Sequence, residues 1–341
     1  TAAAARASCG PGAAALLGAR LGAMLGAECG GGVEELQLPH GALCQLRTAL
    51  RERGYGAAQP CPVQGWGAAQ ASLVALELGA RRLAALGYPP VFIFAFDEAW
   101  AVLDLLWQPM QATLGEDCAM DPSAFCWIAR SGSPATPARS DAAATRAPAG
   151  APAGAPAGAG GAPAGGGGGG GGGGAVANDD AAGMNFGMPH RDFTCLQSLD
   201  KDGAPTLLSV WLPLTEVTTD NGCMMVVPRT LDRHFTNRWA YAHMRPALLG
   251  DDDEVLELRF DLQAARALAP LARGSVVAWC GNTIHWGTRC APGSAAPPRV
   301  SVGFNFLRGG ERLQSGAPSL SRADARALGL PQRLAIIARS L

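Results

Sequence analysis

The stretch that decides the fold spans residues 209–228 and reads S-V-W-L-P-L-T-E-V-T-T-D-N-G-C-M-M-V-V-P. It predicts one strand over 206–214 and a second over 223–228, because each run is short, apolar and bounded by turn residues. The D-N-G tripeptide at 220–222 is typical of the turn of a β-hairpin. The sequence therefore predicts that these two strands pair with each other.

Further short strands are expected around this stretch, at 190–198, 255–260, 275–280, 284–288 and 299–307. Clusters of Gly, Asn, Asp and Pro separate them, and many short strands with such turn signals are typical of a barrel or a jelly roll. Upstream, apolar spacing predicts helices over 40–53 and about 70–86. A buried strand is expected over 91–96, then a helix capped by Asp97, then a strand over 124–129. The pattern favours an α+β fold that is mainly β, with N-terminal helices packed on the sheet.

Composition divides the chain into five segments. Residues 1–32 are expected to form a disordered Ala/Gly-rich arm, and 33–130 the N-terminal helices and first strands. Residues 131–180 contain A-P-A-G repeats and ten consecutive glycines. Because this composition cannot offset the cost of ordering the backbone, it predicts a disordered insertion. Residues 181–310 are expected to form the strand-rich core and 311–341 a helical tail.

Charge and composition exclude several classes of function. The 27 basic and 28 acidic residues leave a net charge of −1, so the chain lacks the electrostatic footprint of a nucleic-acid-binding protein. No apolar run free of Gly and charge reaches the roughly 18 residues of a membrane-spanning helix, so no membrane partner is expected. Lys201 is the single lysine, which excludes a phosphate-binding G-K-[ST] loop and the lysine strand of a protein kinase.

The ten cysteines indicate the redox compartment. None stands in a C-x-x-C pair, and in a chain of this length they are expected to be reduced, mostly buried thiols. This favours an intracellular location, with the cytoplasm as first choice. Because segment 1–32 could also be the remnant of a transit peptide, an organelle stays open. The oligomeric state is not predicted.

Two of the five histidines, His190 and His285, are candidate metal ligands. Residues i and i+2 of a strand face the same side, so His190 and Asp192 are expected to lie together, with Arg191 on the opposite side. His285 follows a second apolar run and a turn. If both strands line one cavity, two imidazoles and one carboxylate meet there, which suits a non-haem Fe(II) site. Taken alone, an H-x-D pair is more often a surface pair or a hydrogen-bonded core histidine.

Arg299 sharpens this interpretation. In the run 299–306, a period of two places Arg299, Ser301, Gly303 and Asn305 on one face and apolar residues on the other. A buried guanidinium needs a carboxylate or phosphate partner, and its fork matches a carboxylate in a bidentate manner. An internal Arg–Asp pair and a surface strand are the alternatives.

Four motifs occur in a telling order: H-R-D at 190–192, the stretch 209–228, L-A-R-G-S-V-V-A-W at 271–279 followed by His285, and P-R-V-S at 298–301. Over about residues 183–310 they resemble the phytanoyl-CoA dioxygenase family of Fe(II)- and 2-oxoglutarate-dependent oxygenases. The resemblance implies a double-stranded β-helix, a cupin-like jelly roll. The implied iron ligands and catalytic residues are His190, Asp192 and His285. The implied cosubstrate-binding residues are Arg299, Ser301 and Trp211, although Trp211 could equally be a core aromatic residue.

The same resemblance implies the reaction. It is the hydroxylation of an unactivated C–H bond of a small organic substrate by O2, with release of succinate and CO2. Two alternatives stay open: a catalytically inactive jelly-roll binding module, and a Zn-dependent cupin-like hydrolase using the same three ligands.

The substrate is suggested by one basic cluster, made up of Arg229, Arg233, His234, Arg238, His243 and Arg245. It faces a single acid, Asp232, within 229–245. The cluster could attract an anionic or acyl substrate, or it could pair with the acidic run at 251–254.

Overall fold

The computed structural model describes residues 40–58, 66–129, 189–237, 246–249, 255–288, 290–291, 294, 297–311 and 318–341. The expected arm at 1–32 and the expected insertion at 131–180 lie outside the described residues.

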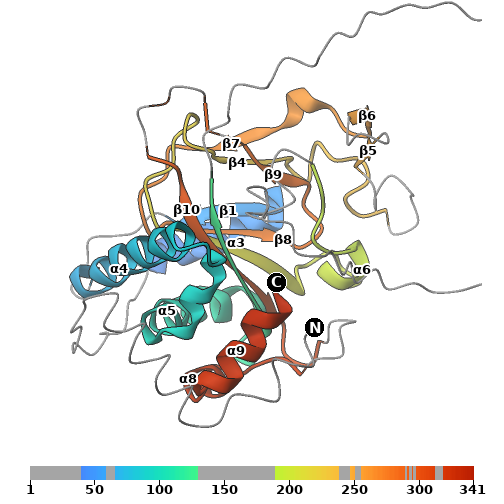
Figure 1. Cartoon of the computed structure of the whole chain (residues 1–341). Coiled ribbons are helices and arrows are strands. Elements are labelled where there is room, and N and C mark those ends of the chain that lie inside the picture. The colour runs from blue at the N-terminus through green and yellow to red at the C-terminus, as the bar shows by residue number, and fades with distance from the viewer. Residues whose placement is uncertain are drawn as a thin grey trace, which may run out of the picture.

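Two antiparallel sheets form the centre of the molecule (Figure 1). The larger has the order β1-β8-β3-β10-β2, with bounds Tyr55–Ala58, Val276–Cys280, Leu207–Pro213, Val300–Leu307 and Ala119–Ile128. The smaller has the order β7-β4-β9, with bounds Arg266–Leu268, Met224–Val226 and His285–Gly287. A separate ribbon pairs β5 (Ala247–Leu249) with β6 (Val255–Leu258).

The inner faces of the two sheets pack against each other. One apolar cluster contains Trp211 and Val277 of the larger sheet together with Met224 and Val226 of the smaller sheet. Two antiparallel sheets packed face to face in this way form a jelly roll, and the predicted fold class is confirmed.

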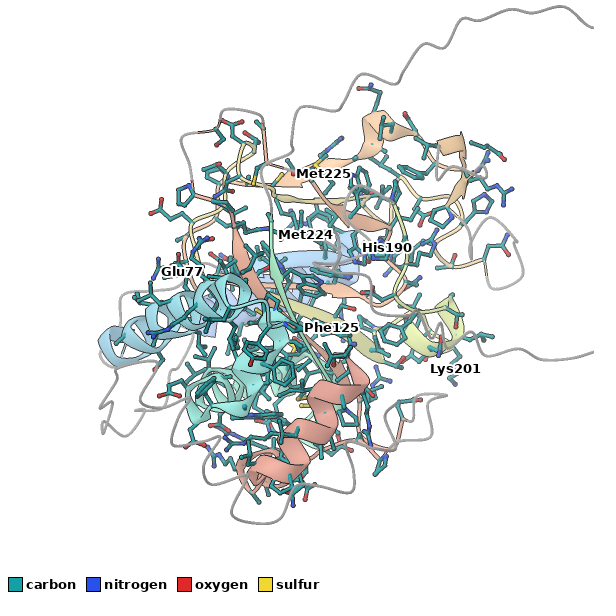
Figure 2. The ribbon with its side chains drawn as sticks, in the orientation of Figure 1. Glu77, Phe125, His190, Lys201, Met224 and Met225 are labelled. Atoms are coloured by element: carbon teal, nitrogen blue, oxygen red, sulfur yellow. The ribbon has the colours of Figure 1, made fainter. Side chains whose placement is uncertain are left out.

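Helices cover the outer face of the larger sheet (Figure 1). They are α3 (His40–Arg53), α4 (Trp66–Ala85), α5 (Asp97–Leu114), α8 (Arg322–Arg326) and α9 (Leu330–Arg339), with the 3-10 helix η1 (Pro90–Ala95). Phe304 of β10 meets Phe94 edge to face at a centroid distance of 5.4 Å, and Phe306 meets Trp107 at 5.0 Å. Side chains fill the space between these layers (Figure 2). None of the described helices is long and apolar enough to cross a membrane.

The period of two on β10 separates core from cavity as predicted. Its apolar members pack with the helices in the main core. On the other face, Gly303 lies opposite Trp211 of β3 and Phe125 of β2, and Asn305 lies opposite Ser209. Directly opposite residues of an antiparallel pair share a face. These side chains therefore form one continuous inner surface across three strands.

The outer edge of this sheet, strand β2, is held by the C-terminal segment. Met120 and Leu320 exchange two backbone hydrogen bonds of 2.8 Å. Further along the strand, the backbone N–H of Ala124 donates to Ser340 Oγ at 3.2 Å. The edge is thus partly paired by residues that come from the far end of the chain.

The predicted hairpin is wrong. Strand β3 pairs with β8 and β10 in the larger sheet, whereas β4 pairs with β7 and β9 in the smaller one. The D-N-G segment therefore lies in a connection between sheets. Asn221 closes this loop by accepting from Thr218 N at 2.9 Å and donating to Glu216 O at 2.9 Å. An Asn-Gly pair occurs in several types of turn. Here the hydrogen bonds of the Asn221 side chain stabilise a loop longer than a two-residue hairpin turn.

Two other expected elements differ from the structure. Residues 91–96 lie mainly in η1, because an apolar run alone cannot distinguish a strand from a helix and Pro90 starts the helical turn. The expected strand at 190–198 is reduced to a single bridge at His190, followed by the short helix α6 (Cys195–Ser198). A capping box between Thr194 and Gln197 starts that helix. Asp97 is the first residue of α5 and does not cap it.

Seven of the ten cysteines fall in the described part of the chain. All seven are free thiols, six of them buried and Cys44 exposed. This agrees with the expectation of reduced, mostly buried cysteines.

Candidate metal centre

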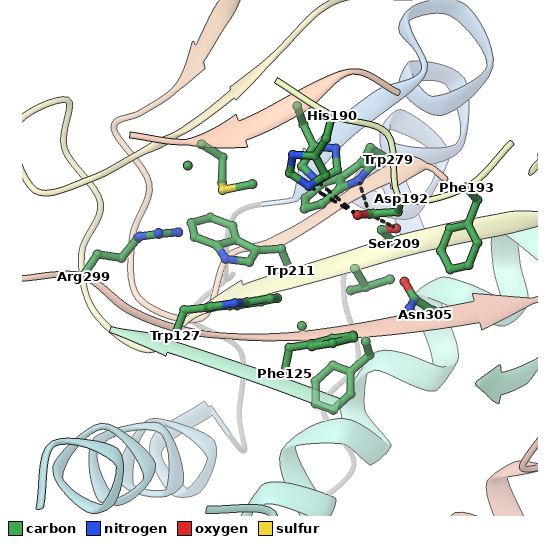
Figure 3. A pocket seen from close by; sticks show the side chains of 16 residues that line it. Phe125, Trp127, His190, Asp192, Phe193, Ser209, Trp211, Trp279, Arg299 and Asn305 are labelled. Carbon is green, nitrogen blue, oxygen red and sulfur yellow. Dashed lines mark hydrogen bonds and ion pairs between the residues drawn. The ribbon is translucent and has the colours of Figure 1, made fainter. Parts of the chain in front are cut away.

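The structure brings His190, Asp192 and His285 together between the two sheets (Figure 3). Asp192 Oδ1 lies 3.6 Å from His190 Nε2 and 3.5 Å from His285 Nε2. One ligand atom from each residue lies within 4.8 Å of the others. Ligands about 2.1 Å from a metal and at right angles are separated by roughly 3 Å, so small side-chain movements would let all three bind one ion.

A backbone bridge places the two imidazoles side by side. His190 and His285 each donate a backbone N–H to the other's carbonyl at 3.0 Å, and their ring centroids are 4.3 Å apart. His285 begins strand β9, so the bridge attaches the H-R-D segment to the smaller sheet. The sequence predicted that His190 and Asp192 would converge through a strand; the structure achieves this with one bridge and a bend.

The His285 ring is fixed in one orientation. Its Nδ1 lies 3.0 Å from Thr283 O, a contact in which Nδ1–H donates and the Nε2 lone pair points toward Asp192. Burial lowers the pKa of His285 to about 4, although the Asp192 carboxylate opposes the shift. The ring is therefore neutral at physiological pH, which is the form that binds metals.

The Asp192 carboxylate is oriented by two donors. Ser209 Oγ donates to Asp192 Oδ2 at 2.7 Å, and Trp279 Nε1 donates to the same oxygen at 3.3 Å. Oδ1 is left facing the two imidazoles. Burial opposes ionisation, but His285, which is protonated in the acidic range where Asp192 titrates, acts with His190 and the Ser209 hydroxyl to hold the pKa of Asp192 well below its usual range.

Sequence reasoning did not identify Ser209 and Trp279. They are register partners on β3 and β8, so they share the inner face of the larger sheet. The available signal was that Ser209 lies two residues before Trp211 on the same strand.

Arg191 points away from the cavity, as predicted, and joins three segments. Its guanidinium forms an ion pair with Asp232 at 2.8 Å, in which both side chains are almost fully buried. It also donates to the backbone carbonyl of Asn282, in the turn before His285. The side chain between the two H-R-D ligands therefore anchors the turn that leads to the third.

Arg299 lies at the opposite end of the inner surface from the histidines (Figure 3). It is 1 % exposed, and its guanidinium carbon is 5.0 Å from the centre of the Trp211 ring. Burial lowers the pKa of Arg299 to about 10, so it remains cationic at neutral pH. A buried guanidinium at the end of a cavity suits a carboxylate ligand, because its fork matches the two carboxylate oxygens.

Two further polar groups lie near this end of the surface. Trp211 Nε1 and Ser301 Oγ are buried and make no hydrogen bond to any described residue. Trp211 lines the cavity, whereas Ser301 is buried within β10 and is not among the described lining residues. An indole N–H and a guanidinium offer donors to an acceptor-rich group, so the residues present fit a carboxylate ligand at this end.

One cavity of about 260 Å³ connects the two ends. It contains the three candidate metal ligands, Trp211 and Arg299, and it is otherwise lined mainly by aromatic rings. Pockets for small ligands have this character: apolar walls with a few convergent polar groups.

The basic cluster predicted near the substrate is only partly described. Arg229 donates to Arg51 O at 2.8 Å and lies over the Phe235 ring at 4.9 Å. Neither Arg229 nor Arg233 is among the described residues that line the cavity. The cluster's remaining members between 238 and 245, and the acidic run at 251–254, lie outside the described residues. The predicted anionic or acyl substrate stays a prediction.

Two histidines and one carboxylate that can bind one ion and leave positions open are typical of non-haem Fe(II) oxygenase sites. Residues 176–290 match the model of the phytanoyl-CoA dioxygenase (PhyH) family, so the resemblance seen in the sequence is confirmed over that segment. The match includes His190, Asp192 and His285 and ends before Arg299.

Comparison with other proteins adds distant structural similarities. No curated protein matches the chain. The non-heme alpha-ketoglutarate-dependent epimerase SnoN from nogalamycin biosynthesis is 15% identical, with a TM-score of 0.40 over 79% of this chain and 84% of its own. The non-heme monooxygenase ThoJ is 14% identical, with a TM-score of 0.44 over 86% of this chain and 98% of its own. AviO1 from Streptomyces viridochromogenes is 14% identical, with a TM-score of 0.41 over 84% of this chain and 100% of its own. Because these scores are low, the functional argument rests on the family match and the site.

Proposed function

We propose that this protein is an Fe(II)- and 2-oxoglutarate-dependent dioxygenase that hydroxylates an unactivated C–H bond of a small organic substrate and releases succinate and CO2. The observation that carries the proposal is the placement of the His190, Asp192 and His285 group and of buried Arg299 on one inner surface, at opposite ends of one cavity. A zinc hydrolase with the same three ligands would not require a buried arginine at the far end of the cavity, so it leaves the position of Arg299 unexplained.

Each side chain has a defined part in this proposal. His190, Asp192 and His285 would hold Fe(II) and supply three of its ligands. Ser209 and Trp279 keep Asp192 Oδ2 occupied, so that Oδ1 is the oxygen directed at the ion. The neutral state of His285 means that no proton must leave its Nε2 before the metal binds.

The cosubstrate is oriented from the far end of the cavity. Arg299 would bind the distal carboxylate of 2-oxoglutarate, with Trp211 along the cavity wall; Ser301, which is not among the described lining residues, is not assigned a contact. A cosubstrate held by Arg299 at its distal carboxylate would be kept in one orientation in the cavity. The bound iron and 2-oxoglutarate supply the oxidising chemistry with O2, while the aromatic walls exclude water.

The first test is anaerobic addition of Fe(II) and 2-oxoglutarate to the purified protein. We expect a weak visible charge-transfer band from the metal–oxo acid chelate. His285→Ala should abolish the band because it removes one of three ligands. A folded, iron-loaded protein without the band would contradict the proposal, and a band without succinate release under O2 would favour the inactive binding module.

A second test separates metal binding from cosubstrate binding. Arg299→Lys keeps the positive charge but loses the bidentate fork, so we expect the 2-oxoglutarate concentration needed for half of the band to rise at least tenfold while metal affinity is unchanged. Equal titration curves for the wild type and Arg299→Lys would remove Arg299 from the cosubstrate site.

A further inference from the structure

The half of the cavity beyond the metal triad, away from Arg299, is not used by the cosubstrate in the proposed function. Phe193 and Asn305 lie on that side (Figure 3). Across the cavity from the histidines lies Phe125, and Trp127 follows it toward the Arg299 end, below Trp211 (Figure 3). This half is where a substrate would meet the metal, so its chemistry indicates the substrate class.

Phe125 and Trp127 form an aromatic wall. The rings of Phe125 and Trp127 are parallel to within 8°, with centroids 5.4 Å apart. Both residues are partly exposed, although their strand is otherwise well packed. Aromatic faces stack in offset, parallel arrangements, so a flat ring can continue this stack, which a flexible chain cannot do.

The wall is also held in place. Gly303 lies under the Trp127 ring, and a Cβ at that position would be 2.7 Å from Trp127 Cζ3. The absence of a side chain therefore lets the ring lie directly against the backbone of β10. A surface fixed in this way binds a rigid ligand with little loss of side-chain freedom.

Charge is confined to the other parts of the cavity. Of the described residues that line it, the only ones able to carry charge are His190, Asp192, His285 and Arg299, all assigned to metal and cosubstrate. An anionic substrate would bring its charge next to the Asp192 carboxylate with no remaining cation among these described residues. An unpaired charge in such a site is strongly disfavoured.

One polar group remains for the substrate. Asn305 lies opposite Ser209 in the register, and its side chain lines the cavity. Its amide makes no hydrogen bond to any described residue, so both its donor and its acceptor can serve a ligand.

We propose that this half of the cavity binds an uncharged, ring-bearing substrate that stacks on Phe125, extending the Phe125–Trp127 stack, and is oriented by a hydrogen bond with the Asn305 amide. The inference rests on the proposed function and names its substrate class. It departs from the anionic or acyl substrate suggested by the basic cluster in the sequence.

Equilibrium dialysis under anaerobic conditions tests this on the full chain loaded with Fe(II) and saturating 2-oxoglutarate. The probes are 2-naphthol, the matched anion 2-naphthoate, and benzoyl-coenzyme A as a polyanionic acyl compound. Saturating 2-oxoglutarate keeps the probes' carboxylate away from Arg299. We expect 2-naphthol to bind at least tenfold more tightly than either anionic probe.

Variants assign the binding to the wall. Phe125→Ala should weaken 2-naphthol binding at least tenfold, and Asn305→Ala should weaken it severalfold. Phe125→Leu keeps apolar bulk without a flat ring, so its loss of affinity reports stacking even if the alanine variant folds poorly. Leu78→Ala, at an exposed position on α4, is the matched control and should bind like the wild type.

The outcomes separate this inference from the proposed function. If 2-naphthoate or benzoyl-coenzyme A binds as tightly as 2-naphthol, if 2-naphthol does not bind up to its solubility limit, or if Phe125→Leu binds it unchanged, the substrate class is wrong. The visible band in the same sample reports iron and cosubstrate independently. A missing band would instead overturn the proposed function, and dialysis of the metal-free protein would still measure the ring preference.

Discussion

At the scale of single residues, the carboxylate of Asp192 is controlled by groups that are not expected to touch the metal. Ser209 and Trp279 both donate to Oδ2. Donors of this kind orient a metal ligand, and their loss typically costs about 10- to 100-fold in metal affinity.

Ser209→Ala should therefore weaken metal binding by roughly tenfold or more. The measurement is anaerobic calorimetric titration with Co(II) as a stable substitute ion. Ser123→Ala, which removes a serine hydroxyl bonded to Asp121 and not among the described residues that line the cavity, is the control. An unchanged dissociation constant in Ser209→Ala would show that Trp279 alone suffices to orient the carboxylate.

Arg191 makes a different contribution, through stability. Removing the guanidinium leaves Asp232 as a buried charge without its partner, a situation that typically costs about 3 to 5 kcal/mol. We expect Arg191→Met to lower the free energy of unfolding by that amount in urea.

The double variant Arg191→Met/Asp232→Leu should recover much of the lost free energy, because both charges are then absent. If the double variant is no more stable than the single one, the packing of the arginine side chain matters more than its charge.

At the scale of elements, α8 is attached to α5 by one carboxylate. The two carboxylate oxygens of Asp104 each accept a hydrogen bond from the Arg322 guanidinium at 2.8 Å. They also accept hydrogen bonds from the Arg326 guanidinium, at 2.8 Å to Oδ1 and 2.6 Å to Oδ2. Burial opposes ionisation, yet the hydrogen bonds and charges of the two arginines hold the pKa of Asp104 below its ordinary value of 3.8.

This arrangement predicts a pH dependence. A depressed carboxyl pKa contributes stability above 3.8 that is lost as the pH falls through the folded-state value. Asp104→Asn should cost about 1 to 2 kcal/mol at neutral pH. The difference from the wild type in chemical unfolding should shrink below pH 3.8. A difference that stays constant down to low pH would mean that the carboxyl charge is not involved.

Much of the site could be predicted from local sequence periodicity. The i, i+2 relation placed His190 with Asp192, and the alternation around Arg299 separated its polar face from its packed face. These features depend on neighbours within one strand. Strand pairing depends on residues far apart in the chain, which local periodicity does not reveal. For this reason the sequence predicts a hairpin at 220–222, although the two flanking strands belong to different sheets.

The partners of the site residues were missed for the same reason. Ser209 reaches Asp192 only because β3 lies beside β8 and the H-R-D segment bridges to β9. Likewise, Phe125 reaches the cavity through its pairing with Gly303 across β10. Such contacts join residues far apart in the chain, and no local pattern encodes them.

At the scale of the whole molecule, the candidate metal ligands connect separate parts of the chain. His190 and Asp192 precede β3, while His285 begins β9, so an ion bound by all three would join the loop to the smaller sheet. A ligand that binds only the folded state stabilises it by about 2.7 kcal/mol at a concentration 100 times its dissociation constant.

Addition of Co(II) should therefore raise the melting temperature of the wild type by several degrees, and chelation should reverse the rise. His285→Ala should show little or no shift at the same concentration. Equal shifts in both proteins would place the bound ion elsewhere. Circular dichroism during heating is sufficient for the comparison.

The pairing of β2 with the C-terminal segment has a consequence for solution behaviour. An uncovered border strand offers its backbone groups to the border of another molecule, and this is a common origin of aggregation. Leu320 and Ser340 occupy part of the hydrogen-bonding row of β2 that another chain would use. These contacts therefore reduce edge-to-edge association between molecules. Removing the segment that contains Leu320 and Ser340 is expected to promote aggregation, although neither residue lines the cavity.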